Sequence, residues 1–146
     1  MMDKNLAFYG VLFLFLSVIG FGQNERIMIN SSGQLGIGTA SPTAKVTVSG
    51  NAVGTLITDN DGSFDMTAGN NFKCTPSGNF TLTFANIISQ SGNILLVNSG
   101  GHTVSAHTNS KVDANLLATV STAGTYLISY FSDGTNVYLT NSAAYT

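Results

Sequence analysis

Short apolar or alternating runs recur along this chain, and each is bounded by Gly, Asn, Ser or Asp residues. This pattern is typical of the strands of a β-sandwich or barrel. Only two windows, residues 86–90 and 113–118, favour a helical turn, and neither is long enough for a stable helix. We therefore predict an all-β fold, in detail an antiparallel, jelly-roll-like β-sandwich with a short extended N-terminal lead-in. Strands are predicted at residues 26–29, 44–48, 54–58, 79–84, 93–97, 102–106, 125–131 and 136–140.

The run NFTLTF at residues 79–84 shows the alternation most clearly. Successive strand side chains point to opposite faces of a sheet, so Phe80, Leu82 and Phe84 share one face. One face of this strand is predicted to lie in the core and the other to face solvent. The run NILLV at residues 93–97 is apolar on both faces, which favours a central strand or a strand at a subunit interface.

A hairpin is predicted near the C-terminus. Asp133 and Gly134 stand between two runs of aromatic and β-branched residues. Asp-Gly readily adopts the positive φ angles that a tight hairpin turn needs. The two flanking runs are therefore expected to pair antiparallel.

The N-terminus has the zones of a secretory signal peptide. An almost wholly apolar run at residues 6–19 follows Asp3 and Lys4 and precedes the small residues Gly20 and Gly22. The alternative, a retained membrane anchor, is disfavoured because a bilayer span needs about 20 residues. We predict a signal peptide at residues 1–23, a lead-in and trimerisation segment at 24–53 and a head domain at 54–146. The mature chain is expected to be secreted or at the cell surface, with no stable membrane span.

Few charges are available for recognition. Charged residues make up 8% of the 146 residues, and the formal net charge is −2. The chain has no basic run that would neutralise phosphates, which argues against nucleic acid as a partner. No nucleophile elbow or dinucleotide fingerprint is present. We therefore predict a non-enzymatic protein with no cofactor and no catalytic residues.

Two features of the sequence carry side chains that can take part in chemistry, an aspartate cluster and a single cysteine. Asp59, Asp61 and Asp65 lie close enough in sequence to be weak calcium candidates, but the glycine stands at the fourth position and not the sixth of a calcium loop, and no glutamate closes the site. A solvated turn is the favoured interpretation. Cys74 is the only cysteine, so no intrachain disulfide can form, and a half-buried strand position is favoured over a reactive thiol.

Tyrosines are the remaining candidates for ligand binding. Tyr126, Tyr130 and Tyr138 combine an apolar ring with a polar tip, as surfaces that bind neutral glycans or proteins do. Tyr126 and Tyr130 are predicted to share a strand face. The alternative is that these rings cap the core with their hydroxyl groups at its edge.

The stretch GIGTASPTAKVTVSG at residues 36–50 is interpreted as an assembly element. Gly36 and Gly38 allow a tight or positive-φ backbone, and Pro42 fixes a bend. Val46 and Val48 start a strand whose apolar side chains need a partner surface. A strand that cannot bury its own apolar face predicts self-association, with docking on its own domain as the competing interpretation.

This stretch resembles the GIGT-x-SP-x-x-K-L-x-V-x-G segment of bacteriophage tail-fibre proteins and of secreted Bacteroidetes surface proteins. The remainder of the chain is similar to a β-domain of phage tail and virion proteins that ends in a D-G-T-N-x-Y hairpin. The matching residues here are Asp133, Gly134, Thr135, Asn136 and Tyr138.

The resemblance implies a role in fibres and no active residues. Together with the residue patterns it predicts a homotrimeric structural or adhesive protein, with a cell-surface glycan as a candidate ligand. Two alternatives stay open. One is a monomeric carbohydrate-binding module, and the other is a prophage-derived tail-fibre or virion component.

Overall fold

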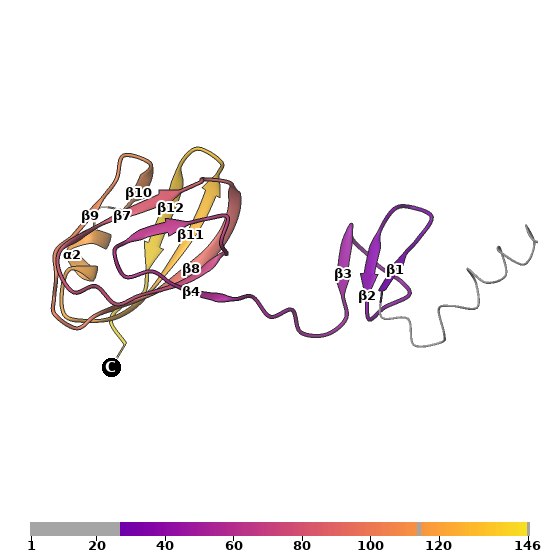
Figure 1. Ribbon diagram of the computed structural model, residues 1–146, viewed down its shortest axis with the longest axis horizontal. Coiled ribbons are helices and arrows are strands. Elements are labelled where there is room, and N and C mark those ends of the chain that lie inside the picture. Colours follow the sequence, from indigo (N-terminus) through magenta and orange to yellow (C-terminus); the bar gives the residue numbers. More distant parts are fainter. Residues whose placement is uncertain (1–26, 114, 146) are drawn as a thin grey trace, which may run out of the picture. The chain divides into compact units, whose positions relative to one another are not determined.

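The computed structural model describes residues 27–113 and 115–145, and the signal peptide predicted at residues 1–23 lies outside them. The chain divides into an N-terminal unit, Met1–Val53, and a C-terminal unit, Gly54–Thr146. Strands predominate in the described residues of both units, so the predicted all-β class is confirmed (Figure 1). Among these residues no helix has the length and apolar character that crossing a bilayer requires.

The N-terminal unit contains a three-stranded sheet, whereas the sequence predicted an extended lead-in with strands at residues 26–29 and 44–48 and no sheet between them. Asn30 explains why the chain folds back: its Oδ1 accepts hydrogen bonds from the backbone N–H groups of Ser32 and Gln34, each at 3.0 Å. The first two strands pair antiparallel across this turn, and the third pairs parallel to the second. The strands are β1 (Ile27–Ile29), β2 (Leu35–Ile37) and β3 (Val46–Val48).

The C-terminal unit contains a six-stranded sheet in the order β10-β12-β11-β8-β6-β4 and a three-stranded sheet in the order β5-β7-β9. One short helix, α2 (Leu116–Val120), completes it. The strands are β4 (Leu56–Thr58), β5 (Ser63–Asp65), β6 (Asn71–Cys74), β7 (Phe80–Ala85), β8 (Ser89–Asn98), β9 (Val104–Ala106), β10 (Ser110–Val112), β11 (Gly124–Asp133) and β12 (Val137–Asn141).

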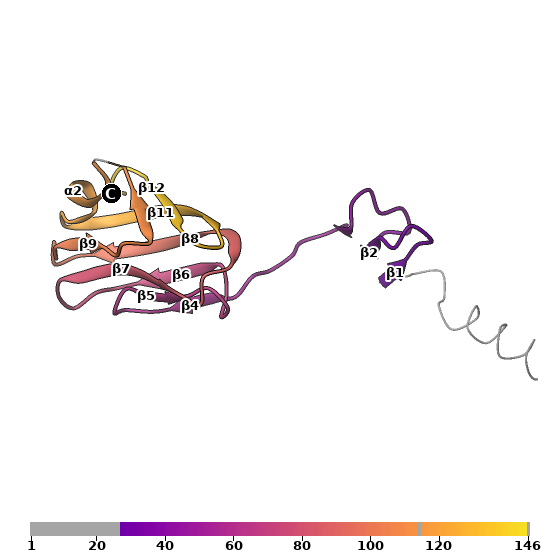
Figure 2. The same cartoon turned by 90° about the horizontal axis from the view of Figure 1, so that it is seen from above.

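The expected antiparallel arrangement is wrong for most of this unit. From β4 to β9 the chain alternates between the two sheets, and each new strand pairs parallel to the one two elements earlier. Figure 2 shows this progression from β4 and β5 to β11 and β12. Parallel neighbours need a crossover connection, and here each crossover passes through the other sheet. Among the described strands of this unit, the antiparallel pairs are β8 with β11 and β11 with β12. The predicted hairpin between β11 and β12 is confirmed, with Gly134 at φ 94°.

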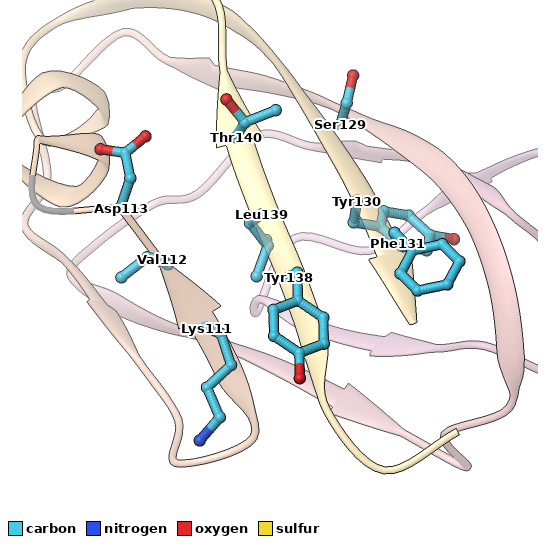
Figure 3. Close-up of a pocket in the computed structure, with 9 residues that line it drawn as sticks. All are labelled: Lys111, Val112, Asp113, Ser129, Tyr130, Phe131, Tyr138, Leu139 and Thr140. Atoms are coloured by element: carbon cyan, nitrogen blue, oxygen red, sulfur yellow. The ribbon is translucent and has the colours of Figure 1, made fainter. Parts of the chain in front are cut away.

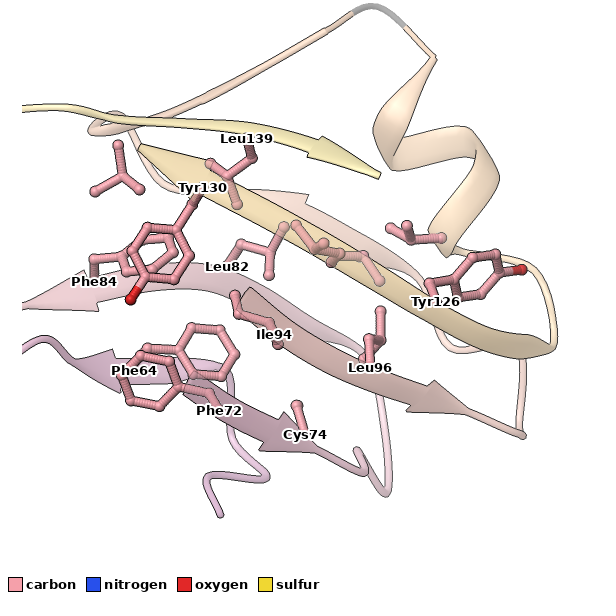
Figure 4. Packing of buried hydrophobic residues seen from close by; sticks show 14 of the residues in the cluster. Phe64, Phe72, Cys74, Leu82, Phe84, Ile94, Leu96, Tyr126, Tyr130 and Leu139 are labelled. Carbon is pink, nitrogen blue, oxygen red and sulfur yellow. The ribbon is translucent and has the colours of Figure 1, made fainter. Parts of the chain in front are cut away.

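Side chains from both sheets meet in one core (Figure 4). Phe64 of the smaller sheet lies 5.2 Å from Phe72 of the larger sheet, measured between ring centroids. Phe84 lies 5.3 Å from Tyr130 in the same way. As predicted for residues 79–84, Phe80, Leu82 and Phe84 are buried on one face of β7. Tilted aromatic pairs at these separations add to the free energy gained by burying their surface.

Asn98 is the polar anchor at one end of this core. Its side chain is fully buried, and its Nδ2 donates to the carbonyl oxygens of His102 and Val120 at 2.8 and 2.9 Å. Its Oδ1 accepts from the backbone N–H of His102 at 2.8 Å. One amide side chain thus provides hydrogen-bond partners for backbone groups in the turn after β8 and at the end of α2.

We predict that Asn98→Leu lowers the free energy of unfolding by about 3 kcal/mol, because three backbone groups, two of His102 and the buried carbonyl of Val120, lose their partner at about 1 kcal/mol each. Urea unfolding of residues 24–146 measures this change. The control is Ser99→Ala at the neighbouring exposed position, for which we expect a change below about 0.5 kcal/mol. Equal stability of the two variants would contradict the anchoring role of Asn98.

Candidate functional site

One face of the N-terminal sheet is entirely apolar. Strand register places Ile29 opposite Leu35 and Leu35 beside Val46, and it places Ile27, Ile37 and Val48 in a second row. Five of these six side chains remain between 38% and 72% exposed, Leu35 being the exception. We call this surface the lead-in face; it consists of Ile27, Ile29, Leu35, Ile37, Val46 and Val48.

The opposite face of the same sheet is covered by its own loop. The hydroxyl of Thr47 accepts hydrogen bonds from the backbone N–H groups of Thr43 and Ala44 at 3.0 and 3.1 Å. Pro42 is buried in this loop. The loop between β2 and β3 therefore covers one side of the sheet, and the lead-in face on the other side remains exposed.

The glycines singled out from the sequence permit this close fit. A methyl group on Gly36 would collide with the carbonyl of Thr39. Gly38 has a φ of +73°, and a Cβ there would lie 2.8 Å from the carbonyl oxygen of Ser49. Both positions thus need glycine for a structural reason that the sequence pattern anticipated only in part.

The C-terminal unit carries a hollow of about 520 Å³ on the outer side of its larger sheet (Figure 3). Phe131 and Tyr138 are direct neighbours on β11 and β12, and their side chains are 57% and 47% exposed. Lys111 of β10 is in register with Tyr138 on its other side. We call this site the aromatic hollow; its lining includes Lys111, Asp113, Ser129, Phe131, Tyr138 and Thr140.

A hydrogen bond orients the tyrosine ring of the aromatic hollow. The Tyr138 hydroxyl donates to Oδ2 of Asp133 at 3.2 Å, and this bond raises the pKa of Tyr138. The backbone N–H groups of Asn136 and Thr135 donate to Asp133 and lower the pKa of its carboxyl group. Asp133 is therefore a charged acceptor that helps to hold the Tyr138 ring in place.

The other two tyrosine candidates are not at the surface. Tyr126 and Tyr130 share a strand face as predicted, but that face points into the core, where they are 0% and 4% exposed. The Tyr130 hydroxyl donates to the carbonyl oxygen of Asn70 at 3.0 Å. Of the three tyrosine candidates, only Tyr138 is exposed. Tyr130 contributes to the lining of the aromatic hollow from its buried position, and the exposed ring beside Tyr138 is Phe131. The exposed position of Phe131 on the opposite face of the same strand is the signal that sequence reasoning missed.

The weak calcium candidates form consecutive turns. Asp59 Oδ1 accepts from the backbone N–H of Asp61, and Asp61 Oδ1 accepts from that of Ser63. Burial and the neighbouring Asp61 raise the pKa of Asp59, whereas the hydroxyl of Thr67 lowers the pKa of Asp65. Within residues 27–113 and 115–145, no three His, Cys, Asp or Glu side chains are grouped so that they could hold a metal ion.

Cys74 lies on β6 and is completely buried, more deeply than the half-buried position predicted. Burial, together with the charges of Asp59 and Asp61, raises the pKa of its thiol to about 12. Because the thiolate is the nucleophile, this environment suppresses reactivity. Cys74 therefore belongs to the core.

No family model, curated protein or solved structure matches this chain. Within the described residues, the lead-in face and the aromatic hollow are accessible surfaces that carry exposed apolar side chains.

We predict that Gly38→Ala unfolds the N-terminal sheet more readily than Gly33→Ala. Both glycines have a φ near +70°, so an alanine at either position costs about 1–2 kcal/mol of backbone strain. Only at position 38 does a backbone atom occupy the space of the new methyl group, whereas the space around Gly33 is open. Amide hydrogen exchange of residues 27–53 should be at least about tenfold less protected in Gly38→Ala. Equal protection in the two variants would contradict the tight fit of this loop.

We predict that the native Cys74 thiol is alkylated by iodoacetamide at pH 8 at least about 100-fold more slowly than in the urea-unfolded chain. Folding raises the pKa of the Cys74 thiol from 9.0 to about 12. As the pH rises, the thiol therefore ionises in the unfolded chain before it ionises in the folded chain. The stability from this protonated thiol is thus present below about pH 9 and is lost as the pH rises toward 12. The slope of stability against pH in this range should diminish in Cys74→Ala. Equal alkylation rates would show that the thiol is accessible.

Proposed function

We propose that this chain is a secreted, non-enzymatic structural or adhesive protein that assembles as a homotrimer through its lead-in face. The observation that carries the proposal is the six-residue apolar face of the β1–β3 sheet, which its own loop leaves bare. A sheet with one apolar face must bury that face against a second layer. The same sheet in the other two chains of a trimer is the layer that we propose.

The composition of the lead-in face supports a homotypic contact. All six of its side chains are aliphatic, so identical copies meet without like-charge repulsion. Aliphatic β-branched side chains also pack well between pleated sheets. The choice of three copies follows from the resemblance of residues 36–50 to fibre lead-in segments, in which three identical segments surround one axis.

For the head, we infer a two-layered β-sandwich built from parallel crossovers. The shared core of Phe64, Phe72, Phe84 and Tyr130 supports two facing layers. The parallel pairs favour a wound arrangement over a jelly roll, which is built from antiparallel strands. A rigid head of this kind suits the tip of a fibre.

We predict that light scattering of residues 24–146 gives three times the chain mass over a wide concentration range. Ile29→Asp and Val46→Asp each place a charge on the lead-in face, and a buried unpaired charge costs several kcal/mol. Both variants should therefore be monomeric at concentrations about 100-fold above those at which the parent chain is trimeric. Both positions are exposed in the single chain, so its fold should tolerate the change.

Val53→Asp is the matched control, because Val53 is 93% exposed and lies outside the sheet. This variant should remain trimeric. A monomeric parent chain at every concentration would overturn the assembly proposal and favour docking of the lead-in face within one chain. A trimer that survives both aspartate variants would show that assembly uses another surface.

A further inference from the structure

We propose that the aromatic hollow binds a neutral oligosaccharide by stacking one pyranose ring on Phe131 and Tyr138. The proposal rests on the adhesive part of the function proposed above and is independent of the oligomeric state. It is carried by the arrangement of apolar and polar side chains on β10, β11 and β12 (Figure 3).

The apolar part of the hollow is a pair of rings on adjacent strands. Phe131 and Tyr138 are in register, and both project from the face opposite to the core residues Tyr130 and Leu139. The C–H groups on one face of a pyranose are apolar and carry a slight positive charge. They therefore complement the negative face of an aromatic ring.

The polar part lies two residues further along the same strands. Thr140 of β12 is in register with Ser129 of β11, so their hydroxyl groups form a row about 7 Å from the aromatic row. Hydroxyl groups at the rim of a stacked sugar ring extend over this distance. A hexose on the rings can therefore exchange hydrogen bonds with Thr140, which can both donate and accept.

Groups at the edge of the hollow add both donors and acceptors. Lys111 donates to the carbonyl oxygen of Thr108 at 2.6 Å, and its ammonium group retains two further donors. Asp113 uses Oδ1 to accept from the backbone N–H groups of Asn115 and Leu116. Among the hydrogen bonds of the described residues, none involves its Oδ2. Sugar hydroxyl groups, which donate and accept at once, match this mixed edge.

Charge and area favour a small neutral ligand over other occupants. The single positive charge of Lys111 and the single negative charge of Asp113 cancel, so the lining attracts neither polyanions nor polycations. A whole aromatic residue has about 250 Å² of surface, so the exposed fractions of Phe131 and Tyr138 together leave about 260 Å² accessible. A stable interface with a second copy needs about 800 Å² per partner. One or two sugar rings cover a surface of the observed size.

Calorimetric titration with pentasaccharides tests this inference. The probes are cellopentaose, mannopentaose and chitopentaose as neutral sugars, a pentagalacturonate as an anionic sugar and a proline-rich decapeptide. We expect at least one neutral pentasaccharide to bind residues 24–146. Saturation-transfer NMR should then give the strongest signals for protons on one ring face of the bound sugar.

Four variants locate the site. Phe131→Ala and Tyr138→Ala should each weaken binding at least about tenfold, because each removes one stacking ring. Tyr138→Phe keeps the ring and should weaken binding less than about threefold. Tyr145→Ala is the matched control, since Tyr145 is 56% exposed but lies outside the hollow, and its affinity should be unchanged. Thermal unfolding of each variant checks that the fold is intact.

Three results would overturn the inference: no neutral sugar binds, the decapeptide or the anionic sugar binds in their place, or both alanine variants bind as tightly as the parent chain. Light scattering on the same samples separates this failure from failure of the assembly proposal. If the chain is a trimer but binds no neutral sugar, the glycan-site proposal alone is contradicted. If the chain is a monomer that binds sugar through Phe131 and Tyr138, the assembly proposal alone is contradicted.

Discussion

Contact between aromatic rings of the two sheets is the interaction on which the C-terminal unit depends. Phe64 touches both Phe72 and Phe84, and Tyr130 lies against both of these rings. The short strands that carry Phe64 and Phe72 have few buried side chains besides these two rings. Because short strands gain little stability from pairing alone, the alternating path from β4 to β9 relies on this shared cluster.

The N-terminal sheet has no aromatic cluster of this kind among its described residues, so other interactions stabilise it. Backbone hydrogen bonds, the Asn30 turn and the loop closed by Thr47 define its fold. Its aliphatic side chains contribute little burial within the sheet, since five of six are exposed. Hydrophobic burial supplies most of the driving force for stable β-structure. The lead-in face is therefore the part of the described chain that gains most from a second layer.

Sequence reasoning located the strands well and their pairing poorly. Every predicted run overlaps an observed strand, because alternation and turn residues are local signals. The strands β2, β5, β6 and β10 were missed, and β5 shows why: Phe64 is its one buried side chain, between Ser63 and Asp65 in a stretch that favours a turn. Strand direction depends on partners distant in sequence, so the parallel pairs could not be predicted from alternation. Of the lead-in face, only Val46 and Val48 were predicted from their need for a partner, and of the three tyrosines only Tyr138 lies at the surface.

The alternation of side chains between the two faces of a strand places Tyr126 and Tyr130 in the core, and it also places the rings of the aromatic hollow at the surface. Tyr130 and Phe131 are consecutive on β11, so fixing one ring in the core fixes the other on the surface. Tyr130 is held by its hydrogen bond to the Asn70 carbonyl and by one from Gln90 Nε2 at 3.3 Å. On β12, the buried Leu139 sets the outward direction of Tyr138. The two exposed rings are therefore preorganised by core packing, and a ligand that stacks on them need not order a flexible surface, which lowers the entropic cost of binding.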